Sequence, residues 1–369
     1  MGAMDGTGTR SALRVTLSPV GDLSGVEAAW RELEARSDAP FFRSWTWVGC
    51  LAAERFADPV LARALRDGRL VGLALFNRHG GRWARRLSLG ESGDPELDSP
   101  FVEHNGPLLA VGEGRAAELA ILRAALALPG IAGLRLSGVE PSLLQAAREA
   151  GSVLAGLHER PAPRVRLDDL PAGEGAYLEA LSANTRQQLR RSNRRYAAGG
   201  ALAIERARSV PEALEWLDAL IVLHGAAWRA RGRPGAFASP FMVRFHQALV
   251  ARGVPRDEVD LLRATAGGRV IGYLYNFRRG GHVCAYQSGF DYAVPDPYAK
   301  PGLTSHHLAI ERARAAGDRT YDFLAGDDRY KRSLATGVET LAWAEAARPR
   351  SLLGLAARAR RAASAVRPA

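Results

Sequence analysis

Two β-hairpins are predicted from the alternation of hydrophobic and polar residues along the chain. The first joins residues 60–65 to residues 70–77 through Arg66-Asp67-Gly68, and an Asp-Gly pair favours the tight turn of a hairpin. Residues 261–283 repeat residues 61–83 with a shift of 200 and no gap, and nine of the 23 aligned positions are identical. Chance similarity of two hairpins is one explanation, but we favour a tandem pair of the same α/β domain.

The first half begins with a predicted strand over residues 13–17 and a helix over residues 26–35, for which Ser24 is a candidate cap. An aromatic segment, residues 41–47, is interpreted as a helix that packs on a core rather than as a ligand-stacking surface. After the hairpin, the pattern predicts a helix followed by a strand, at residues 114–128 and 134–138.

The second half continues the same order. A helix is predicted over residues 210–230 before the second hairpin, and a helix and a strand follow it. Thr304 or Ser305 is expected to cap the later helix, which ends at Gly317. The strand covers residues 320–324 and leads into a polar loop.

These elements predict an α/β fold of two similar domains. A proline-rich, charged segment at residues 158–163 suggests the boundary between them. We therefore expect a first domain over residues 13–160, a second over residues 161–347 and a basic tail over residues 348–369. The first half has neither an aspartate before its Gly138 nor a Tyr-Lys pair after it, so the chemistry is expected in the second half.

The amino-acid composition indicates the cellular compartment of the protein and the kind of partner that it binds. The net charge of +11 favours anionic partners, namely phosphorylated cofactors, nucleic acid or acidic lipid surfaces. Two cysteines exclude a disulfide framework and a cysteine-rich metal site, which is typical of a reducing cytoplasm. The most apolar segment, residues 116–136, is too short and too interrupted to span a bilayer. We therefore expect a cytoplasmic protein.

The most basic segment runs over residues 182–195, where Asn184 and Gln187 have the spacing of a capping box. On a helix, Arg186, Arg190 and Arg194 lie in one row. Three interpretations stay open: a solvated basic face, a clamp for the phosphates of a substrate or cofactor, and a nucleic-acid surface. Aromatic residues do not interrupt the row, which disfavours stacking on single strands.

The loop and helix start at residues 300–305 form a candidate anion site. Gly302 permits close approach, and the Thr304 and Ser305 hydroxyls would lie beside free helix amides that suit a pyrophosphate. The alternative is an ordinary capped helix. The only two lysines of the chain, Lys300 and Lys331, both lie between residues 296 and 334, which suggests that a compact ammonium is used there.

Asp322 lies between apolar residues on a strand, where a buried charge needs a partner. It is predicted to be either a general base of raised pKa or the partner of an arginine. In the loop that follows, Tyr330 is a candidate proton donor, Lys331 a candidate anion ligand and Asp327 a candidate substrate ligand, although a solvated turn would look the same.

Other polar residues were weighed for binding and catalysis. Tyr273, Tyr286 and Gln287 lie on strands and form either a polar rim for substrate or amphipathic packing. His307 and Glu311 share a helix face at i, i+4, but His306, His307 and Glu311 do not make a complete ligand set, so no metal is expected. Cys284 has no histidine or acid fixed beside it by spacing, which disfavours an acyl-carrier role.

Several of these segments, taken in order, resemble a known family. They are Ser182-Ala-Asn-Thr-Arg186, Leu189-Arg-Arg191, Gly272-Tyr273, Pro301-Gly302 and Tyr321-Asp-Phe-Leu-Ala-Gly326-Asp-Asp-Arg-Tyr330-Lys331. The chain is similar to GNAT-superfamily acyltransferases of the CelD/BcsL type, which carry a BioF2-like acetyltransferase domain, and to the tandem-GNAT FemABX proteins. The resemblance covers residues 165–345 well and the first half loosely.

The resemblance implies a tandem pair of GNAT-like domains, each a mixed, mostly antiparallel sheet flanked by helices. It implies acetyl-CoA or another acyl-CoA as donor, with its pyrophosphate at Lys300, Pro301, Gly302, Leu303, Thr304 and Ser305. Here Tyr298-Ala-Lys-Pro-Gly302-Leu-Thr304 stands where the family has Arg/Gln-x-x-Gly-x-Gly/Ala. The catalytic residues would be Asp322, Tyr330 and Lys331, with Arg186 and Arg190 binding substrate. FemABX enzymes use aminoacyl-tRNA, so a tRNA-dependent aminoacyltransferase of peptidoglycan is the alternative, and a non-catalytic anion- or nucleic-acid-binding module is a third.

Overall fold

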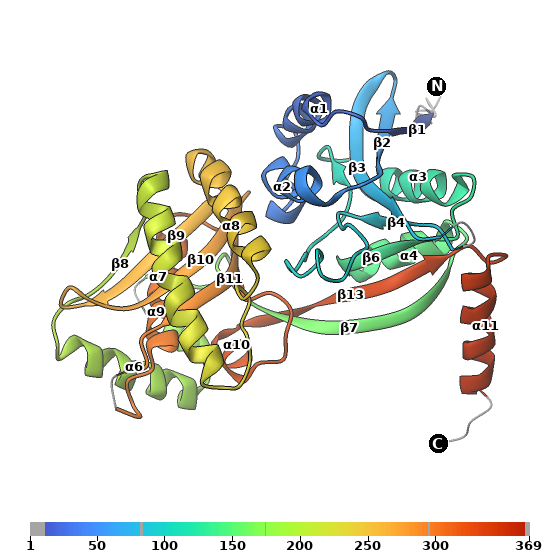
Figure 1. Ribbon diagram of the computed structural model, residues 1–369. Coiled ribbons are helices and arrows are strands. Elements are labelled where there is room, and N and C mark those ends of the chain that lie inside the picture. The colour runs from blue at the N-terminus through green and yellow to red at the C-terminus, as the bar shows by residue number, and fades with distance from the viewer. Residues whose placement is uncertain (1–11, 82–83, 174, 294–295, 366–369) are drawn as a thin grey trace, which may run out of the picture.

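The chain consists of two sets of elements that repeat one order. The structure is a computed structural model that describes residues 12–81, 84–173, 175–293 and 296–365 (Figure 1). The first set comprises β1 (Leu13–Pro19), α1 (Ser24–Glu34), η1 (Phe41–Arg43), α2 (Trp45–Arg55), β2 (Pro59–Arg66), β3 (Arg69–His79), β4 (Arg86–Leu89), β5 (Leu108–Leu109), α3 (Gly114–Ala127), β6 (Gly133–Val139), α4 (Pro141–Glu149) and β7 (Val153–Arg166).

Two helices, α5 (Ala176–Ala180) and α6 (Ala183–Ala197), separate this set from the second. The second set comprises β8 (Leu202–Arg206), α7 (Val210–Arg229), α8 (Pro240–Gly253), η2 (Val254–Arg256), β9 (Val259–Ala266), β10 (Arg269–Arg279), β11 (His282–Phe290), α9 (Pro301–Ala315), β12 (Thr320–Asp322), α10 (Arg329–Leu334) and β13 (Gly337–Ala347). The helix α11 (Leu352–Ala365) follows. Apart from the two-residue strand β5 and the short helices η1 and η2, each half has the order strand, two helices, three strands, helix, strand, helix, strand.

The predicted repeat is confirmed. β2 and β9 have bounds 200 residues apart, and so do β3 and β10. The two hairpin turns also match, because Asp67 and Gly68 have φ of 50° and 77°, and Gly267 and Gly268 have φ of 56° and 79°. Two successive positive φ angles make the turn whose twist suits a two-residue hairpin. One such turn uses Asp-Gly and the other Gly-Gly.

All strands described join one 13-stranded mixed sheet in the order β1-β2-β3-β4-β6-β13-β7-β12-β11-β10-β9-β8, with β5 paired to β3. Each half exchanges its last strand with the other half. β7, the last strand of the first half, pairs with β12 of the second, and β13, the last strand of the second half, pairs with β6 of the first. β7 and β13 also pair with each other, as the long ribbons between the halves in Figure 1 show.

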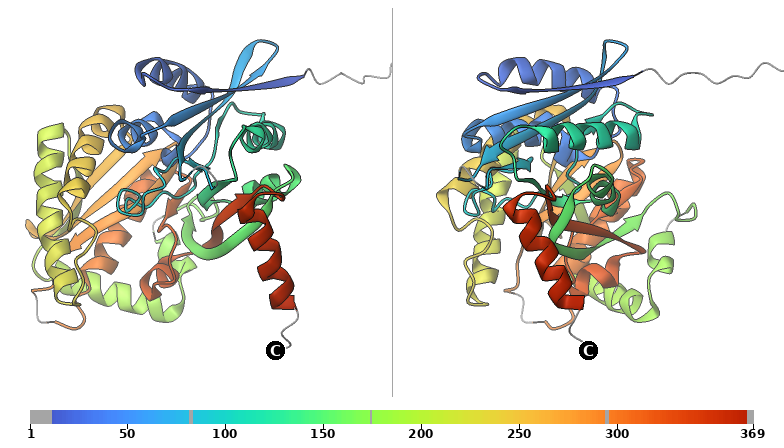
Figure 2. Two further views of the ribbon diagram at one scale, coloured as in Figure 1. Left: turned by 45° about the vertical axis from the view of Figure 1, so that its right-hand side comes forward. Right: turned by 90° about the vertical axis from the view of Figure 1, so that its right-hand side faces the viewer.

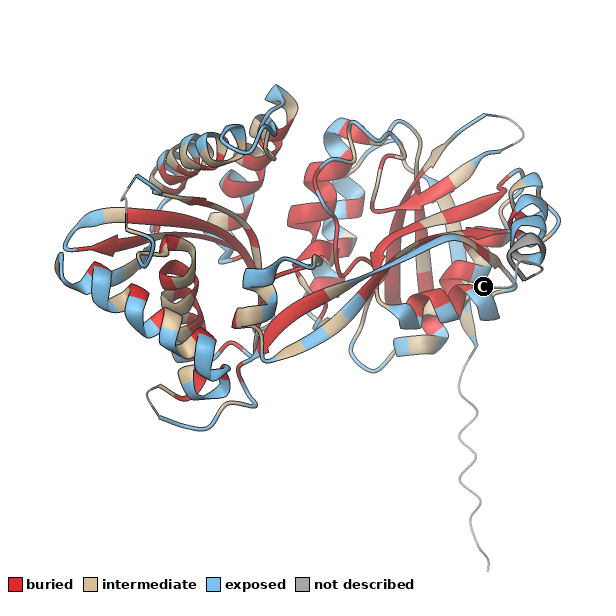
Figure 3. Cartoon of the chain, turned by 90° about the horizontal axis from the view of Figure 1, so that it is seen from below, coloured by how far each residue is buried: buried red, intermediate tan, exposed pale blue. Residues whose placement is uncertain are grey.

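Aromatic side chains of both halves form a shared core. Phe41 and Trp47 of the first half contact Phe277 of β10, with the Phe41 and Phe277 rings stacked 4.2 Å apart. All three are buried, and Figure 3 shows the sheet strands largely buried beneath helices with exposed outer faces. The expectation that residues 41–47 pack on a core is therefore confirmed.

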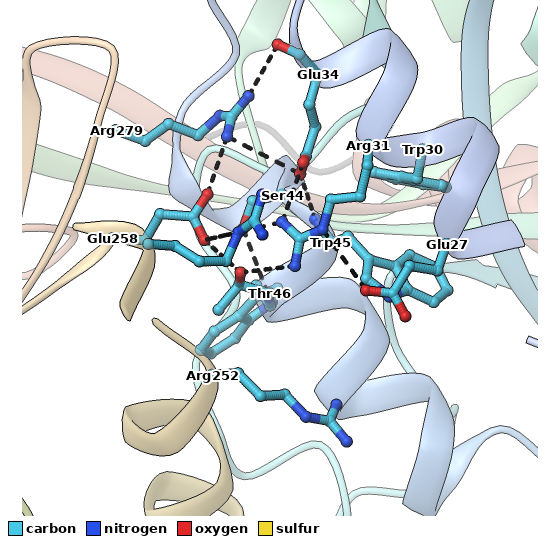
Figure 4. A network of polar contacts seen from close by, with 12 residues as sticks. Glu27, Trp30, Arg31, Glu34, Ser44, Trp45, Thr46, Arg252, Glu258 and Arg279 are labelled. Atoms are coloured by element: carbon cyan, nitrogen blue, oxygen red, sulfur yellow. Dashed lines mark hydrogen bonds and ion pairs between the residues drawn. The ribbon is translucent and has the colours of Figure 1, made fainter. Parts of the chain in front are cut away.

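Buried charges connect the halves beside this core (Figure 4). Arg279 of β10 pairs with Glu258 at 3.0 Å and donates to the backbone oxygen of Glu34 at 3.1 Å. Arg31 pairs with Glu34 at 3.0 Å, and the Thr46 hydroxyl donates to Glu258. Each of the two buried carboxylates has a cation or a hydroxyl beside it, so its negative charge is compensated.

Three local predictions were wrong. Ser24 is the first residue of α1, where its hydroxyl bonds Asp22, and so it does not cap the helix. Ser182, not Asn184, caps α6, because its Oγ accepts from the Thr185 amide. α9 begins at Pro301, one turn earlier than a Thr304 or Ser305 cap would place it, since proline at the first helical position has no amide to satisfy.

The proposed domain limits can be compared with the strands. The limit between residues 160 and 161 falls inside β7. This strand pairs with β13 along most of its length and with β12 at its C-terminal end. The proposed tail over residues 348–369 contains α11, which lies against β7 and extends along the outside of the molecule (Figure 2). Within the described residues, no helix has the length and apolar character needed to cross a bilayer.

Candidate functional site

A cavity opens where two parallel strands of the second half separate. β11 pairs with β12 only at residues 282–284, opposite residues 320–322, and β11 then continues alone on that side to Phe290. A cavity of 740 Å³ lies beside this part of β11, lined among others by Tyr286, Gln287 and Ser288 of β11 and by Asp328 and Tyr330 of the segment that follows β12. The pairing with β10 skips one residue at Tyr286, which is a β-bulge, and bulges redirect backbone groups next to sites.

The N-terminus of α9 forms one wall of the cavity. Lys300, Pro301, Gly302 and Leu303 line it. Thr304 makes the first helical bond, donating its amide to the Lys300 oxygen at 3.2 Å. The amides of Gly302 and Leu303 precede that bond, so they point out of the helix start and are suited to an anion.

The Thr304 and Ser305 hydroxyls do not face this cavity, contrary to prediction. Both residues are fully buried. The Thr304 hydroxyl hydrogen-bonds the Ser192 hydroxyl of α6 at 2.8 Å and donates to Asn193 at 3.0 Å. These bonds hold α6 against α9, which makes Thr304 a structural support of the helix start, whereas the buried Ser305 hydroxyl makes no hydrogen bond within the described residues.

A second hollow of 600 Å³ shares Lys300, Leu303 and Tyr330 with the first. Arg191 and Arg329 also line it, so two guanidinium groups lie near the start of α9. Arg186 and Arg190 instead line a separate hollow of 540 Å³ along α6. The basic helix therefore does approach the cavity, but through Arg191, a residue that the sequence prediction did not select.

Asp322 is completely buried at the point where β11 and β12 separate. Its Oδ2 lies 3.0 Å from His104 Nε2, 3.2 Å from His282 Nε2 and 3.0 Å from an Arg164 nitrogen. Burial alone would raise the pKa of the Asp322 carboxyl, but His104 and His282 hold it well below its usual range. The expected raised pKa is therefore wrong, and the alternative, a pair with an arginine, is confirmed.

A second buried carboxyl, Glu103, reaches this point from the first half. Its Oε2 accepts the Ala325 amide at 2.6 Å, and burial raises its pKa to about 6. Lys331 lies close by and donates to the backbone oxygens of Leu324 and Ala325, at 3.3 and 2.9 Å. Burial lowers the pKa of the Lys331 ammonium. Lys331 thus secures the loop after β12.

Tyr330 lines both hollows with 42% of its surface exposed. Its ring stacks on His306 of α9 at 5.8 Å. His306 is buried, which lowers its pKa to about 3 and keeps the imidazole neutral. The stacking fixes the Tyr330 ring between the helix start and the loop after β12.

The other predicted substrate residues lie in different surroundings. Tyr286 and Gln287 line the cavity, whereas Tyr273 packs in the core against Trp216 at 6.2 Å. Asp327 is exposed and pairs with Arg332. Packing, rather than a polar rim, therefore describes Tyr273.

The corresponding gap in the first half is filled. β4 and β6 pair in parallel only at residues 86–88 and 133–135, as β11 and β12 do. Beyond them, the Asn105 side chain donates to the backbone oxygens of Leu89 at 2.8 Å and Ser137 at 3.1 Å. The backbone amide of Asn105 donates to the backbone oxygen of Gly138 at 3.0 Å. Asn105 is buried and bridges both strands, so it occupies the space that stays open in the second half.

Replacing Asn105 with alanine is expected to lower the free energy of unfolding by about 1–3 kcal/mol, because two buried carbonyl groups lose their partner. Donor binding in the second half should not change. Urea unfolding measures the first quantity, and Gln145→Ala, at an exposed site on α4, is the control and should cost less than about 0.5 kcal/mol. A cost for Asn105→Ala no greater than the control would contradict the bridging role.

Comparison with known proteins finds one region of the second half that is similar to a family of domains. Residues 183–332 match the family model of the acetyltransferase (GNAT) domain. This region holds the cavity, the start of α9 and the loop with Tyr330. No curated protein matches the sequence.

Solved structures show the same overall fold. FemX has a TM-score of 0.61 at 10% identity, over 90% of this chain and 98% of that one. L-PGS from Bacillus licheniformis has a TM-score of 0.53 at 12% identity, over 88% and 93% of the two chains. A conserved protein of unknown function from Bacteroides thetaiotaomicron has a TM-score of 0.54 at 11% identity, over 90% and 100%. The predicted α/β fold of tandem GNAT-like domains is confirmed, and the domain match supports an acyltransferase.

Proposed function

We propose that this protein transfers an acyl group, most simply acetyl, from acyl-CoA to an amine or another nucleophile on a small molecule or an envelope-polysaccharide precursor. The gap between β11 and β12 is the observation that carries the proposal, because it opens beside free helix amides in the second half and is filled in the first. The domain match over residues 183–332 supports it. Assignment to the CelD/BcsL type with a BioF2-like domain is part of the proposal.

In this proposal the diphosphate of the donor binds the Gly302 and Leu303 amides, with Lys300 beside them. Arg191 and Arg329 neutralise the remaining phosphate charge in the adjoining hollow. The pantetheine arm runs along β11 to the strand separation. The thioester would then lie near the bulge at Tyr286, where backbone amides stabilise the developing oxyanion.

The transfer forms a bond from the acceptor nitrogen to the thioester carbon and breaks the carbon–sulfur bond. The acceptor must lose one proton, and the CoA thiolate must gain one. Tyr330, protonated at neutral pH because burial raises its pKa above the usual tyrosine value of about 10, is the proposed donor to the thiolate. Asp322 is an orienting group rather than the base, since three partners keep it charged and fixed. Glu103 has a pKa raised to about 6 by burial but lines neither hollow, so the proton of the acceptor passes to solvent in this proposal.

The proposal is tested by placing a charge at the proposed phosphate position. Leu303→Glu and Leu303→Gln remove the same apolar packing, so they differ only in charge. Calorimetric titration with CoA should show that Leu303→Glu binds about 10–100-fold more weakly than Leu303→Gln, because like charges a few ångströms apart repel. An acid in the first turn suits the helix dipole, so Leu303→Glu should fold as well as Leu303→Gln.

Equal CoA affinity in the two Leu303 variants would exclude the start of α9 as the donor site. Absence of CoA binding by the wild type, with binding of tRNA instead, would favour a tRNA-dependent enzyme. The exposed row of Arg186 and Arg190 along α6 is the observation that keeps this second function open. Loss of activity after RNase treatment would support it, and RNA binding without any transfer activity would support a binding module.

A further inference from the structure

Two histidines and an aspartate meet in the interior between the halves. His104 comes from the loop between β4 and β5 of the first half, His282 begins β11, and Asp322 ends β12. One ligand atom from each lies within 4.8 Å of the other two. His104 and Asp322 are buried, and His282 retains 17% side-chain exposure, so the cluster is reached from one side.

The backbone holds the three groups in place. His104 has φ of 48°, a conformation that costs energy for a residue with a side chain. Its carbonyl accepts from Arg43 Nε at 2.8 Å, which fixes this turn of the chain. Asp322 Oδ1 accepts the Leu324 amide at 2.7 Å, leaving Oδ2 directed at both histidines. The arrangement is therefore built before any ligand binds.

The spacing suits a divalent cation. Bonds of about 2.0–2.2 Å from zinc to nitrogen and oxygen place neighbouring ligand atoms roughly 3.3–3.5 Å apart in a tetrahedron. The two contacts to Asp322 Oδ2, at 3.0 and 3.2 Å, need to open by only a few tenths of an ångström. Cys284 Sγ lies 4.0 Å from His282 Nε2 but does not belong to the group whose ligand atoms all lie within 4.8 Å of one another, so water would complete the coordination. Two imidazoles beside a single carboxylate favour zinc over magnesium or calcium.

The surrounding charges permit a dication. Arg164 touches Asp322 Oδ2 at 3.0 Å and opposes a metal ion, but its other nitrogen pairs with Glu339 at 2.6 Å. Glu103 adds a third carboxyl group and Lys331 a second cation. A carboxylate has about four lone-pair positions, so Asp322 can keep Arg164 on one and offer another to the metal.

We propose that His104, His282 and Asp322 form a binding site for a zinc-class divalent cation, which ties the loop of the first half to the strands of the second. The site shares Asp322 with the acyl-transfer proposal, in which Asp322 is an orienting group, but that proposal requires no metal. Its test needs neither CoA nor an acceptor, so its failure would leave that proposal untouched.

The test uses the full-length chain without a histidine tag, stripped with a chelator and titrated with Co²⁺ as a spectroscopic substitute for zinc. We expect one equivalent to bind, with the visible absorption of a four- or five-coordinate site, and Zn²⁺ to displace it. Zn²⁺ should raise the melting temperature by about 3 °C or more, and EDTA should reverse the rise.

Variants separate this site from adventitious binding. His282→Gln should weaken Co²⁺ binding at least about tenfold, and His158→Gln, at an exposed site on β7, should not change it. Arg164→Gln should strengthen binding, because a repelling charge is removed. The proposal is overturned if the wild type retains no stoichiometric Co²⁺ or Zn²⁺, or if His282→Gln and His158→Gln bind alike. Because His282 is the most exposed member, its variant should fold even where an Asp322 variant does not.

Discussion

Asp322→Asn should lower the free energy of unfolding by about 3–5 kcal/mol at neutral pH, measured by urea denaturation in the presence of a chelator. The substitution keeps the shape of the side chain but removes the charge that compensates Arg164 inside the protein. Asp327→Asn breaks an exposed pair with Arg332 and should cost no more than about 1 kcal/mol. Similar costs for the two variants would show that the buried pair does not stabilise the fold.

The effect of Asp322→Asn should depend on pH in one direction. The pKa of Asp322 is lower in the folded state than its usual value of about 3.9, so the carboxylate contributes its full stabilisation above that pH. The contribution is lost as the pH falls through the folded pKa. The difference between wild type and Asp322→Asn should therefore shrink as the pH falls below about 4. A difference that grew on acidification would contradict the assigned charge state.

Tyr330→Phe should slow acyl transfer by about 100-fold or more while CoA affinity changes less than twofold. The phenylalanine ring can keep the stacking on His306, so the loss isolates the hydroxyl group that is proposed to protonate the thiolate. Single-turnover transfer from acetyl-CoA, with the best acceptor from a panel of amines, sugars and lipids, measures the rate, and titration measures the affinity.

Tyr196→Phe is the matched control, because that ring packs in a separate apolar cluster on α6. Its single-turnover rate should equal that of the wild type. A Tyr330→Phe enzyme as fast as the wild type would remove Tyr330 from the mechanism and would transfer the acid role to another group or to solvent.

Local pattern was enough to predict most of the elements. The shift of 200 residues located both hairpins, since alternation and turn glycines are properties of short segments. α3, α6 and α7 also lie close to their predicted ranges. The exchange of β7 and β13 was not predictable in this way, because the alternation within a strand does not say which strand lies beside it.

The site was predicted only in part, for the same physical reason. Pro301, Gly302 and Tyr330 were selected from one short stretch of the sequence, and all three line the same cavity. His104 and Glu103 reach Asp322 from more than 200 residues away, so no spacing rule connects them. For α6, the buried positions 189, 192 and 196 mark the inward face. Leu189 and Tyr196 are large apolar residues within this basic segment, so their positions indicate the inward face of α6 and hence which arginine row approaches the cavity.

The exchanged strands also bear on how this chain can fold and how it can be divided. A fragment ending near residue 166 would carry β7 away from its β12 partner and would leave the edge of β6 without β13. Such an open edge is a template for pairing with any similar strand nearby, including one from another copy of the fragment. Synthesis must therefore reach residue 347 before the first half is closed, so early folding intermediates on the ribosome remain exposed to mispairing until β13 emerges.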